Sequence, residues 1–245
     1  MWQIAGASIP GSDHTMPGKP GWKNNQDALL LYEEEDVIFG IVSDGCGSGK
    51  FSEVGAQIGV RILGKLINES LSRSKKIDFE RIRMKLLGQI SVLATSMGDS
   101  FSGVINDYFL FSLVGFVITQ DIVTVFYCGD GMYAINGNVT KLGPFPKNAP
   151  PYVSYSLTGD QNPMIETVTF ETENVVSLAI GTDGTDFVPK LEDELSVWLK
   201  TDVLFKNPDV LRRRLALMNL EKIEEGVLTS GPFKDDTTLI IARKL

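Results

Sequence analysis

The chain has 245 residues, of which 43% are apolar, and this is enough to bury one substantial hydrophobic core. Its formal charge of −8 argues against a surface for nucleic acids or anionic membranes, because such a surface needs a basic patch. Two cysteines and one histidine exclude a disulfide framework and the usual structural zinc sites, so any metal site must use oxygen ligands.

The chain is expected to form a single domain over residues 1–245, because no repeat, low-complexity tract or shift in composition divides it. Its N-terminus lacks the basic start and long apolar region of a signal peptide, and the apolar run at 108–118 is too short to span a bilayer. The expected location is therefore the reducing cytoplasm, and neither a membrane nor a nucleic acid is an expected partner.

The first predicted elements are a strand at residues 3–8 and a hairpin. Two apolar, β-branched runs at 28–32 and 37–43 predict the strands of the hairpin, and the acidic residues between them predict its turn. Antiparallel pairing brings the start of one strand next to the end of the other. Asp27 and Asp44 should therefore be neighbours.

Two long helices are predicted to follow, the first starting at Ser52 and the second covering residues 78–99. Apolar side chains recur at helical spacing in both, and charged side chains of the first helix occupy its opposite face. The predicted buried face of the first helix consists of Val54, Ile58, Ile62, Leu66 and Ile67. The apolar face of each helix is therefore expected to pack against a sheet.

The second half of the chain is predicted to consist mostly of strands. Residues 109–119, 122–128 and 132–135 indicate a meander, and the Asn-Gly pair that follows indicates a type I′ turn into a strand at 139–141. The remaining predicted strands lie at 154–157, 165–170, 175–181 and 237–242, with helices at 196–200 and 208–224. Strands and helices in separate blocks favour antiparallel sheets covered by helices over alternating βαβ units.

Four aspartates stand next to β-branched runs, namely Asp27, Asp44, Asp183 and Asp235. Any one Asp-Gly pair is more simply an ordinary surface turn, but the four together favour a shared site at one rim of the sheets. Carboxylates at close quarters repel one another, and a divalent cation relieves that repulsion. Oxygen ligands without histidine indicate magnesium or manganese, and the glycine at Gly45 lets the backbone carbonyl approach as a further ligand.

Two such ions, about 3.5 to 4 Å apart, would hold a bridging hydroxide for in-line attack on phosphorus, which predicts phosphate-ester hydrolysis. Five motifs occur in order along the chain: Asn25-Gln26-Asp27-Ala28, Ser43-Asp44-Gly45-Cys46-Gly47-Ser48-Gly49, Cys128-Gly129-Asp130, Gly181-Thr182-Asp183-Gly184 and Asp235-Asp236-Thr237-Thr238-Leu239-Ile240. They resemble the motifs of the metal-dependent protein phosphatase family, the protein phosphatase 2C type. Its compact bacterial branch is resembled by Gly6-Ala7-Ser8 with Ser12-Asp13-His14, and by Ser52-Glu53-Val54-Gly55-Ala56. The resemblance implies an α+β fold, a four-layer α-β-β-α sandwich of two antiparallel sheets flanked by helices.

The resemblance also implies a role for each aspartate. Asp44 would bridge two Mg²⁺ or Mn²⁺ ions that hold the attacking hydroxide, and the carbonyl of Gly45 would bind one of the ions. Asp183 and Asp235 would complete the ligands of the other ion, while Asp27 would act nearby through a coordinated water. The implied enzyme is a protein serine/threonine phosphatase, a hydrolase that dephosphorylates phosphoserine and phosphothreonine in signalling.

The resemblance also implies residues that would assist metal binding, proton transfer and phosphate binding. Asp130 matches the position that binds a third, looser ion in some family members, with Asp186 as a helper. His14 is a candidate to approach the leaving-group oxygen, although a lone loop histidine is equally a surface or capping residue. Lys19 and Lys23 are the nearest cations to the place where the family usually has a phosphate-binding arginine, and lysine binds phosphate as a point charge.

Two positions depart from the family pattern. Gln26 stands where many eukaryotic members have glutamate, and Cys46 stands at the histidine position of the family's Asp-Gly-His-Gly turn. The departures leave two alternatives open, a pseudophosphatase that binds a phosphoprotein partner without turnover and a phosphatase for small-molecule phosphate esters. The main expectation is a phosphorylated protein substrate, with a cognate Ser/Thr kinase or the targets of that kinase as partners.

Overall fold

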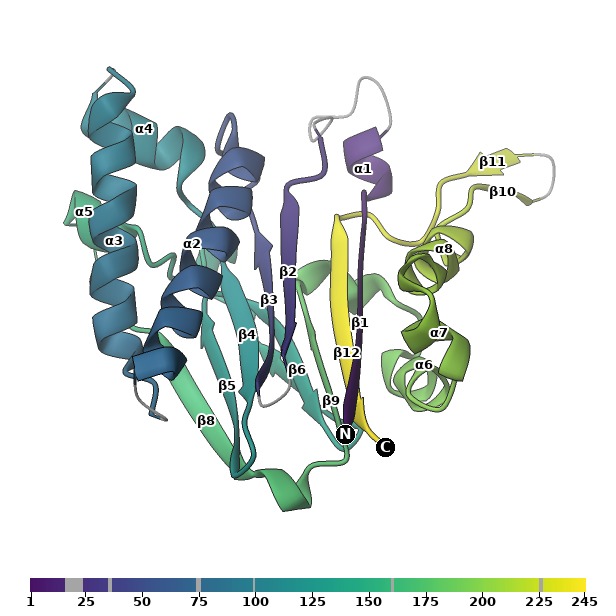
Figure 1. Ribbon diagram of the computed structural model, residues 1–245. Coiled ribbons are helices and arrows are strands. Elements are labelled where there is room, and N and C mark those ends of the chain that lie inside the picture. The colour runs from purple at the N-terminus through teal and green to yellow at the C-terminus, as the bar shows by residue number, and fades with distance from the viewer. Residues whose placement is uncertain (16–23, 35–36, 74–75, 99, 160, 225–226) are drawn as a thin grey trace.

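Two five-stranded antiparallel sheets lie face to face at the centre of the molecule, and helices cover their outer surfaces (Figure 1). The computed structural model describes residues 1–15, 24–34, 37–73, 76–98, 100–159, 161–224 and 227–245. The layers confirm the predicted α-β-β-α sandwich.

The strands of each sheet come from distant parts of the chain. The first sheet contains, in spatial order, β1 (Trp2–Ile9), β12 (Thr237–Lys244), β9 (Ser177–Gly181), β6 (Gly131–Ile135) and β7 (Asn138–Leu142). The second sheet contains β2 (Asp27–Glu34), β3 (Val37–Asp44), β4 (Leu113–Ile118), β5 (Ile122–Cys128) and β8 (Glu166–Glu171). A separate hairpin joins β10 (Lys222–Glu224) and β11 (Val227–Thr229).

The helices fall into two groups. The second sheet is covered by α2 (Ser52–Arg73) and α3 (Phe79–Ser96), with α4 (Phe101–Tyr108) and α5 (Tyr155–Thr158) beside them. The first sheet is covered by α6 (Leu191–Trp198), α7 (Asp202–Lys206) and α8 (Pro208–Met218), while α1 (Ser12–Thr15) lies at one end of the strands. None of the described helices has both the length and the apolar composition to cross a membrane.

Strand alternation builds the three apolar layers between these elements. In β3, Phe39 and Ile41 face the helices, whereas Ile38 and Val42 face the other sheet. Strand β12 alternates in the same way between the two sides of its own sheet. A strand that is buried on both faces reads as a continuous apolar run, which explains the composition of β3 and β12.

The buried face of α2 differs from the predicted one. Val54, expected in the core, is 41% exposed, whereas the small residues Gly55 and Gly59 are buried. A side chain at Gly59 would lie 2.5 Å from the ring of Phe111, so the glycines let the helix approach the sheet closely. The prediction was wrong because it considered only large apolar side chains. Close packing of this helix depends instead on glycines, which have no side chain.

Strand β6 does not continue the predicted meander. It leaves β5 and pairs with β9 and β7 in the other sheet, with Gly129 and Gly131 at positive φ in the connection. Residues 155–158 form α5 instead of part of a strand, and α4 was not predicted. Helix α8 ends at Met218, where the prediction had continued to 224.

Candidate metal centre

The predicted aspartates meet at one end of the sandwich. Asp27 begins β2 and Asp44 ends β3, and the two are direct partners in the antiparallel register, as predicted. Asp183 follows the end of β9 and Asp235 precedes β12, which pairs with β9. Adjacent antiparallel strands therefore deliver the carboxylates from both sheets to the same rim.

These side chains surround a cleft of about 230 Å³. Asp44, Asp130, Asp183 and Asp235 line it, and Asp27 lies behind them with only 3% of its surface exposed. The other described residues that line the cleft are His14, Gln26, Gly45, Cys46, Gly47, Ser48, Pro150 and Tyr152. Five of the six predicted metal ligands thus line one cleft, and the sixth supports it from inside.

Three of the carboxylates, those of Asp27, Asp130 and Asp183, each have a buried oxygen without a hydrogen-bond partner among the described residues. One oxygen of Asp27 accepts a hydrogen bond from Thr182 Oγ1 at 2.8 Å, but Asp27 Oδ1 accepts none from any residue that the structure describes. Buried oxygens of Asp130 and Asp183 are unpaired among the described residues in the same way. Buried, unpaired carboxylate oxygens are costly unless a cation binds them, so this set of donors fits a hard divalent ion.

The electrostatics of the cleft lead to the same conclusion. Burial raises the pKa of Asp27 and Asp44 well above the usual range, and neighbouring carboxylates raise it further. Burial, followed by the charges of Asp235 and Asp130, raises the pKa of Asp183 to about 7. Burial is also the main reason for the raised pKa of Asp130. Bound cations of charge +2 would reverse these effects and keep the carboxylates ionised.

Gly45 is required by the close approach of neighbouring backbone. A Cβ atom at this position would lie 2.8 Å from the backbone of Ser52 and 3.0 Å from the carbonyl of Gln26. The sequence-based reason for a glycine after Asp44 was therefore sound in its steric part. Whether the Gly45 carbonyl is a ligand stays a prediction.

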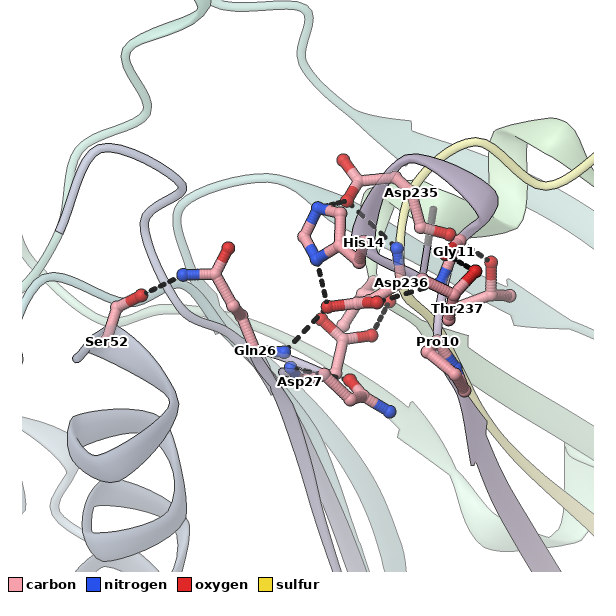
Figure 2. A network of polar contacts seen from close by, with 12 residues as sticks. Pro10, Gly11, His14, Gln26, Asp27, Ser52, Asp235, Asp236 and Thr237 are labelled. Atoms are coloured by element: carbon pink, nitrogen blue, oxygen red, sulfur yellow. Dashed lines mark hydrogen bonds and ion pairs between the residues drawn. The ribbon is translucent and has the colours of Figure 1, made fainter. Parts of the chain in front are cut away.

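His14 lies on α1, at the wall of the cleft (Figure 2). Its Nδ1 is 2.8 Å from Asp236 Oδ2, and its Nε2 is 3.3 Å from Asp235 Oδ1. Hydrogen bonds with Asp235 and Asp236 raise the pKa of His14 to about 10. Both ring nitrogens face carboxylates. This arrangement favours a role for His14 in positioning Asp235, and it disfavours a role as the proton donor.

Asp236 is the main residue of the site that the sequence analysis missed. It is buried and accepts hydrogen bonds from the backbone N–H groups of Gly11 (2.8 Å) and Gln26 (2.6 Å), as well as contacting His14 (Figure 2). It therefore ties β12 to the chain that follows β1 and the chain that precedes β2. The paired aspartates gave a weak signal, but no local pattern distinguishes a ligand from its support.

Three residues that were predicted to assist the reaction, Lys19, Lys23 and Asp186, are not among the described residues that line the cleft. Lys19 and Lys23 lie outside the described residues. Asp186, half-exposed, forms an ion pair with Lys141 Nζ at 2.8 Å and does not line the cleft. The side-chain amide of Gln26 donates a hydrogen bond to Ser52 Oγ, and it thereby connects the start of β2 to the start of α2.

The chain is similar to known proteins in sequence and in fold. A family described as protein phosphatase 2C matches residues 18–218. No curated protein matches the sequence. Among solved structures, the serine/threonine phosphatase Stp1 from Staphylococcus aureus is 15% identical with a TM-score of 0.63, covering 100% of this chain and 96% of its own.

Two other similar structures are described with metals. The catalytic domain of the serine/threonine protein phosphatase PstP, in complex with two manganese ions, is 13% identical with a TM-score of 0.57 and covers 99% of this chain and 97% of its own. RsbX in complex with magnesium is 16% identical with a TM-score of 0.53 and covers 99% and 94%. At such identities the likeness concerns the fold.

Proposed function

This chain belongs to the protein phosphatase 2C family, and from that premise we propose that it hydrolyses phosphoserine and phosphothreonine in proteins with two bound Mg²⁺ or Mn²⁺ ions. The observation that carries the proposal is the set of buried, partly unpaired carboxylates around one cleft. Bound cations relieve the repulsion between carboxylates that are this close together.

The ligands that we propose are the predicted ones. Asp44, which lines the cleft, is the proposed bridging ligand, and the carbonyl of the adjacent Gly45 is the proposed ligand of one ion. Asp183 and Asp235 come from the other sheet, and Asp27 supports the site from behind. When bound, the ions would lower the pKa of a water for in-line attack on phosphorus and offset the charge that develops on the phosphoryl oxygens.

Asp130 is the proposed ligand of a third ion. It lines the cleft, and its Oδ1 has no hydrogen-bond partner among the described residues. An outer, single-carboxylate position of this kind binds an ion more weakly than the buried cluster does. Titration with Mn²⁺ should therefore give two affinity classes.

The partners that we propose are phosphorylated proteins, together with the Ser/Thr kinase that modifies them. The described residues that line the cleft are mostly polar side chains and glycines, whereas sites for particular small molecules are lined mainly by apolar side chains. A pseudophosphatase is the competing candidate, favoured by Cys46 at the turn where the family has histidine.

The deciding experiment is a Mn²⁺-dependent phosphatase assay with a phosphothreonine peptide, an aryl phosphate and a small-molecule phosphate ester. We expect the wild-type protein to act on the peptide, a chelator to stop it, and Asp44→Asn to abolish activity while the protein stays folded. Activity that persists with the chelator, or equal activity in Asp44→Asn, would contradict the proposal. Peptide binding without turnover would establish the pseudophosphatase instead.

A further inference from the structure

Within the described part of the chain, few side chains of the cleft lining are hydrogen-bond donors for a phosphate group. Among the described lining residues, the side chains that carry N–H, O–H or S–H groups are His14, Gln26, Cys46, Ser48 and Tyr152. Both nitrogens of His14 face carboxylates, and the amide of Gln26 donates into the protein. A phosphate dianion needs donors to offset its charge, and among the described side chains of the cleft lining Cys46, Ser48 and Tyr152 remain to provide them.

Tyr152 is the strongest donor of these three. The Cys46 Sγ and Ser48 Oγ atoms lie 3.1 Å apart and engage each other, and a thiol is a weak donor. Tyr152 as a whole is buried, with 6% exposure, and its hydroxyl contacts Cys46 at the cleft wall. Burial, and then the charge and hydrogen bond of Cys46, raise the pKa of Tyr152, so the hydroxyl keeps its proton at neutral pH.

The structure holds this hydroxyl in a fixed place. Cys128 Sγ donates to the carbonyl of Pro151 at 3.1 Å, and Tyr155 N–H donates to the carbonyl of Tyr152 at 3.0 Å. The rings of Tyr152 and Tyr155 are 5.5 Å apart between centroids. A donor that is anchored on both sides in this way loses little entropy when it binds a ligand.

We propose that the Tyr152 hydroxyl is a substrate-binding group that donates a hydrogen bond to a non-bridging oxygen of the phosphoryl group. The inference rests on the proposed function and deepens it, because it assigns a phosphate contact outside the metal ligands. The contact comes from the segment between β7 and β8, so the substrate is held between that segment and the Gly45–Ser48 turn.

The test compares Tyr152→Phe with Tyr155→Phe, a matched control that removes the same hydroxyl three residues further along, outside the cleft lining. Calorimetry with inorganic phosphate on the Mn²⁺-loaded proteins should give a dissociation constant about tenfold weaker for Tyr152→Phe, the usual loss for one hydrogen bond to a charged group. The kcat/KM for a phosphothreonine peptide should fall by a similar factor. The Mn²⁺ affinity and the melting temperature should match those of the control.

Each outcome separates this inference from the proposed function. Equal phosphate affinity in the two variants overturns the role of Tyr152, even when the wild-type enzyme is active. A loss of Mn²⁺ affinity in Tyr152→Phe as large as the loss of phosphate affinity also overturns it, because Tyr152 would then act through the metal ligands. A wild-type protein without turnover that binds phosphate through Tyr152 overturns the proposed function and supports the inference. A wild-type protein that binds no phosphate overturns the inference, and the turnover assay then decides the proposed function separately.

Discussion

At the scale of single residues, the site consists of ligands and of the side chains that hold them. Asp235 faces the cleft, while its neighbour Asp236 is buried and holds His14 and two backbone N–H groups. Supporting residues of this kind orient a ligand and tune its affinity for a metal. The distinction between them depends on contacts with Gly11 and Gln26, which are distant in sequence, so it could not be predicted from the aspartates themselves.

Replacement of His14 by alanine tests its positioning role. We expect His14→Ala to raise the Mn²⁺ concentration for half-maximal activity about tenfold, because Asp235 loses its orienting partner. At saturating Mn²⁺, any loss of kcat should be equal for an aryl phosphate and for a phosphothreonine peptide. Thr15→Ala, on the same short helix, should keep the wild-type Mn²⁺ requirement. A loss confined to the peptide, whose leaving group needs a proton, would identify His14 as a general acid instead.

At the scale of elements, the hairpin β2–β3 was predictable and the switch of β6 between sheets was not. The pairing of Asp27 with Asp44 follows from alternation and a short turn, which are local properties. The departure of β6 from β5 depends on which neighbour completes the other sheet, and β9 supplies that neighbour from 40 or more residues further along. Local patterns therefore predicted the strands and their hairpin partners, but not the pairings between strands that are distant in sequence.

Two glycine substitutions on neighbouring helices should have opposite effects on stability. A Cβ atom at Gly55 in α2 would collide with the backbone carbonyl of Tyr108, whereas a Cβ at Gly88 in α3 meets nothing within 4 Å. Gly88→Ala should stabilise the protein by about 0.5–1 kcal/mol through helix propensity. Gly55→Ala should destabilise it by about 1–3 kcal/mol through overpacking. Urea unfolding measures both, and a stabilising Gly55→Ala would contradict the packing of α2.

Arg83 connects α3 to the segment that follows α5. Its guanidinium pairs with Glu80 at 2.8 Å and donates to Ser156, Asn162 and the carbonyl of Pro163, with the side chain only 5% exposed. Arg83→Met keeps much of the apolar stem but leaves these acceptors without their donor. We expect a loss of about 3 kcal/mol in the free energy of unfolding.

The matched control for this substitution is Arg81→Met on the exposed side of the same helix, which should change stability by no more than about 0.5 kcal/mol. Urea denaturation of both variants provides the comparison. Similar midpoints for the two variants would show that the buried contacts of Arg83 contribute nothing to the fold.

At the scale of the whole molecule, the cleft makes stability depend on pH and on metal. The pKa of Asp183 rises from 3.8 to about 7 on folding, so its ionisation destabilises the metal-free fold as the pH rises through this range. The pKa of His14 rises from 6.5 to about 10, and its contribution, complete below pH 6.5, is lost as the pH rises through 10. Both effects have the same sign.

We therefore expect the metal-free protein to melt at a lower temperature at pH 8 than at pH 5.5. Mn²⁺ should raise the melting temperature most at pH 8, because the ionised carboxylates are then the ligands. Differential scanning calorimetry with and without chelator measures both trends, and Asp183→Asn should weaken the dependence on pH. A metal-free protein that is most stable at pH 8 would contradict the electrostatics of the cleft.

Strand β12 also sets the order in which the protein can be completed during synthesis. It lies between β1 and β9, and it begins immediately after Asp235 and Asp236. While this strand is still inside the ribosome, β1 lacks the strand with which it pairs, and the cleft lacks Asp235 and its buried support Asp236. A nascent chain can therefore fold the β2–β5 sheet early, but it gains a complete metal centre only after residues 235–244 emerge.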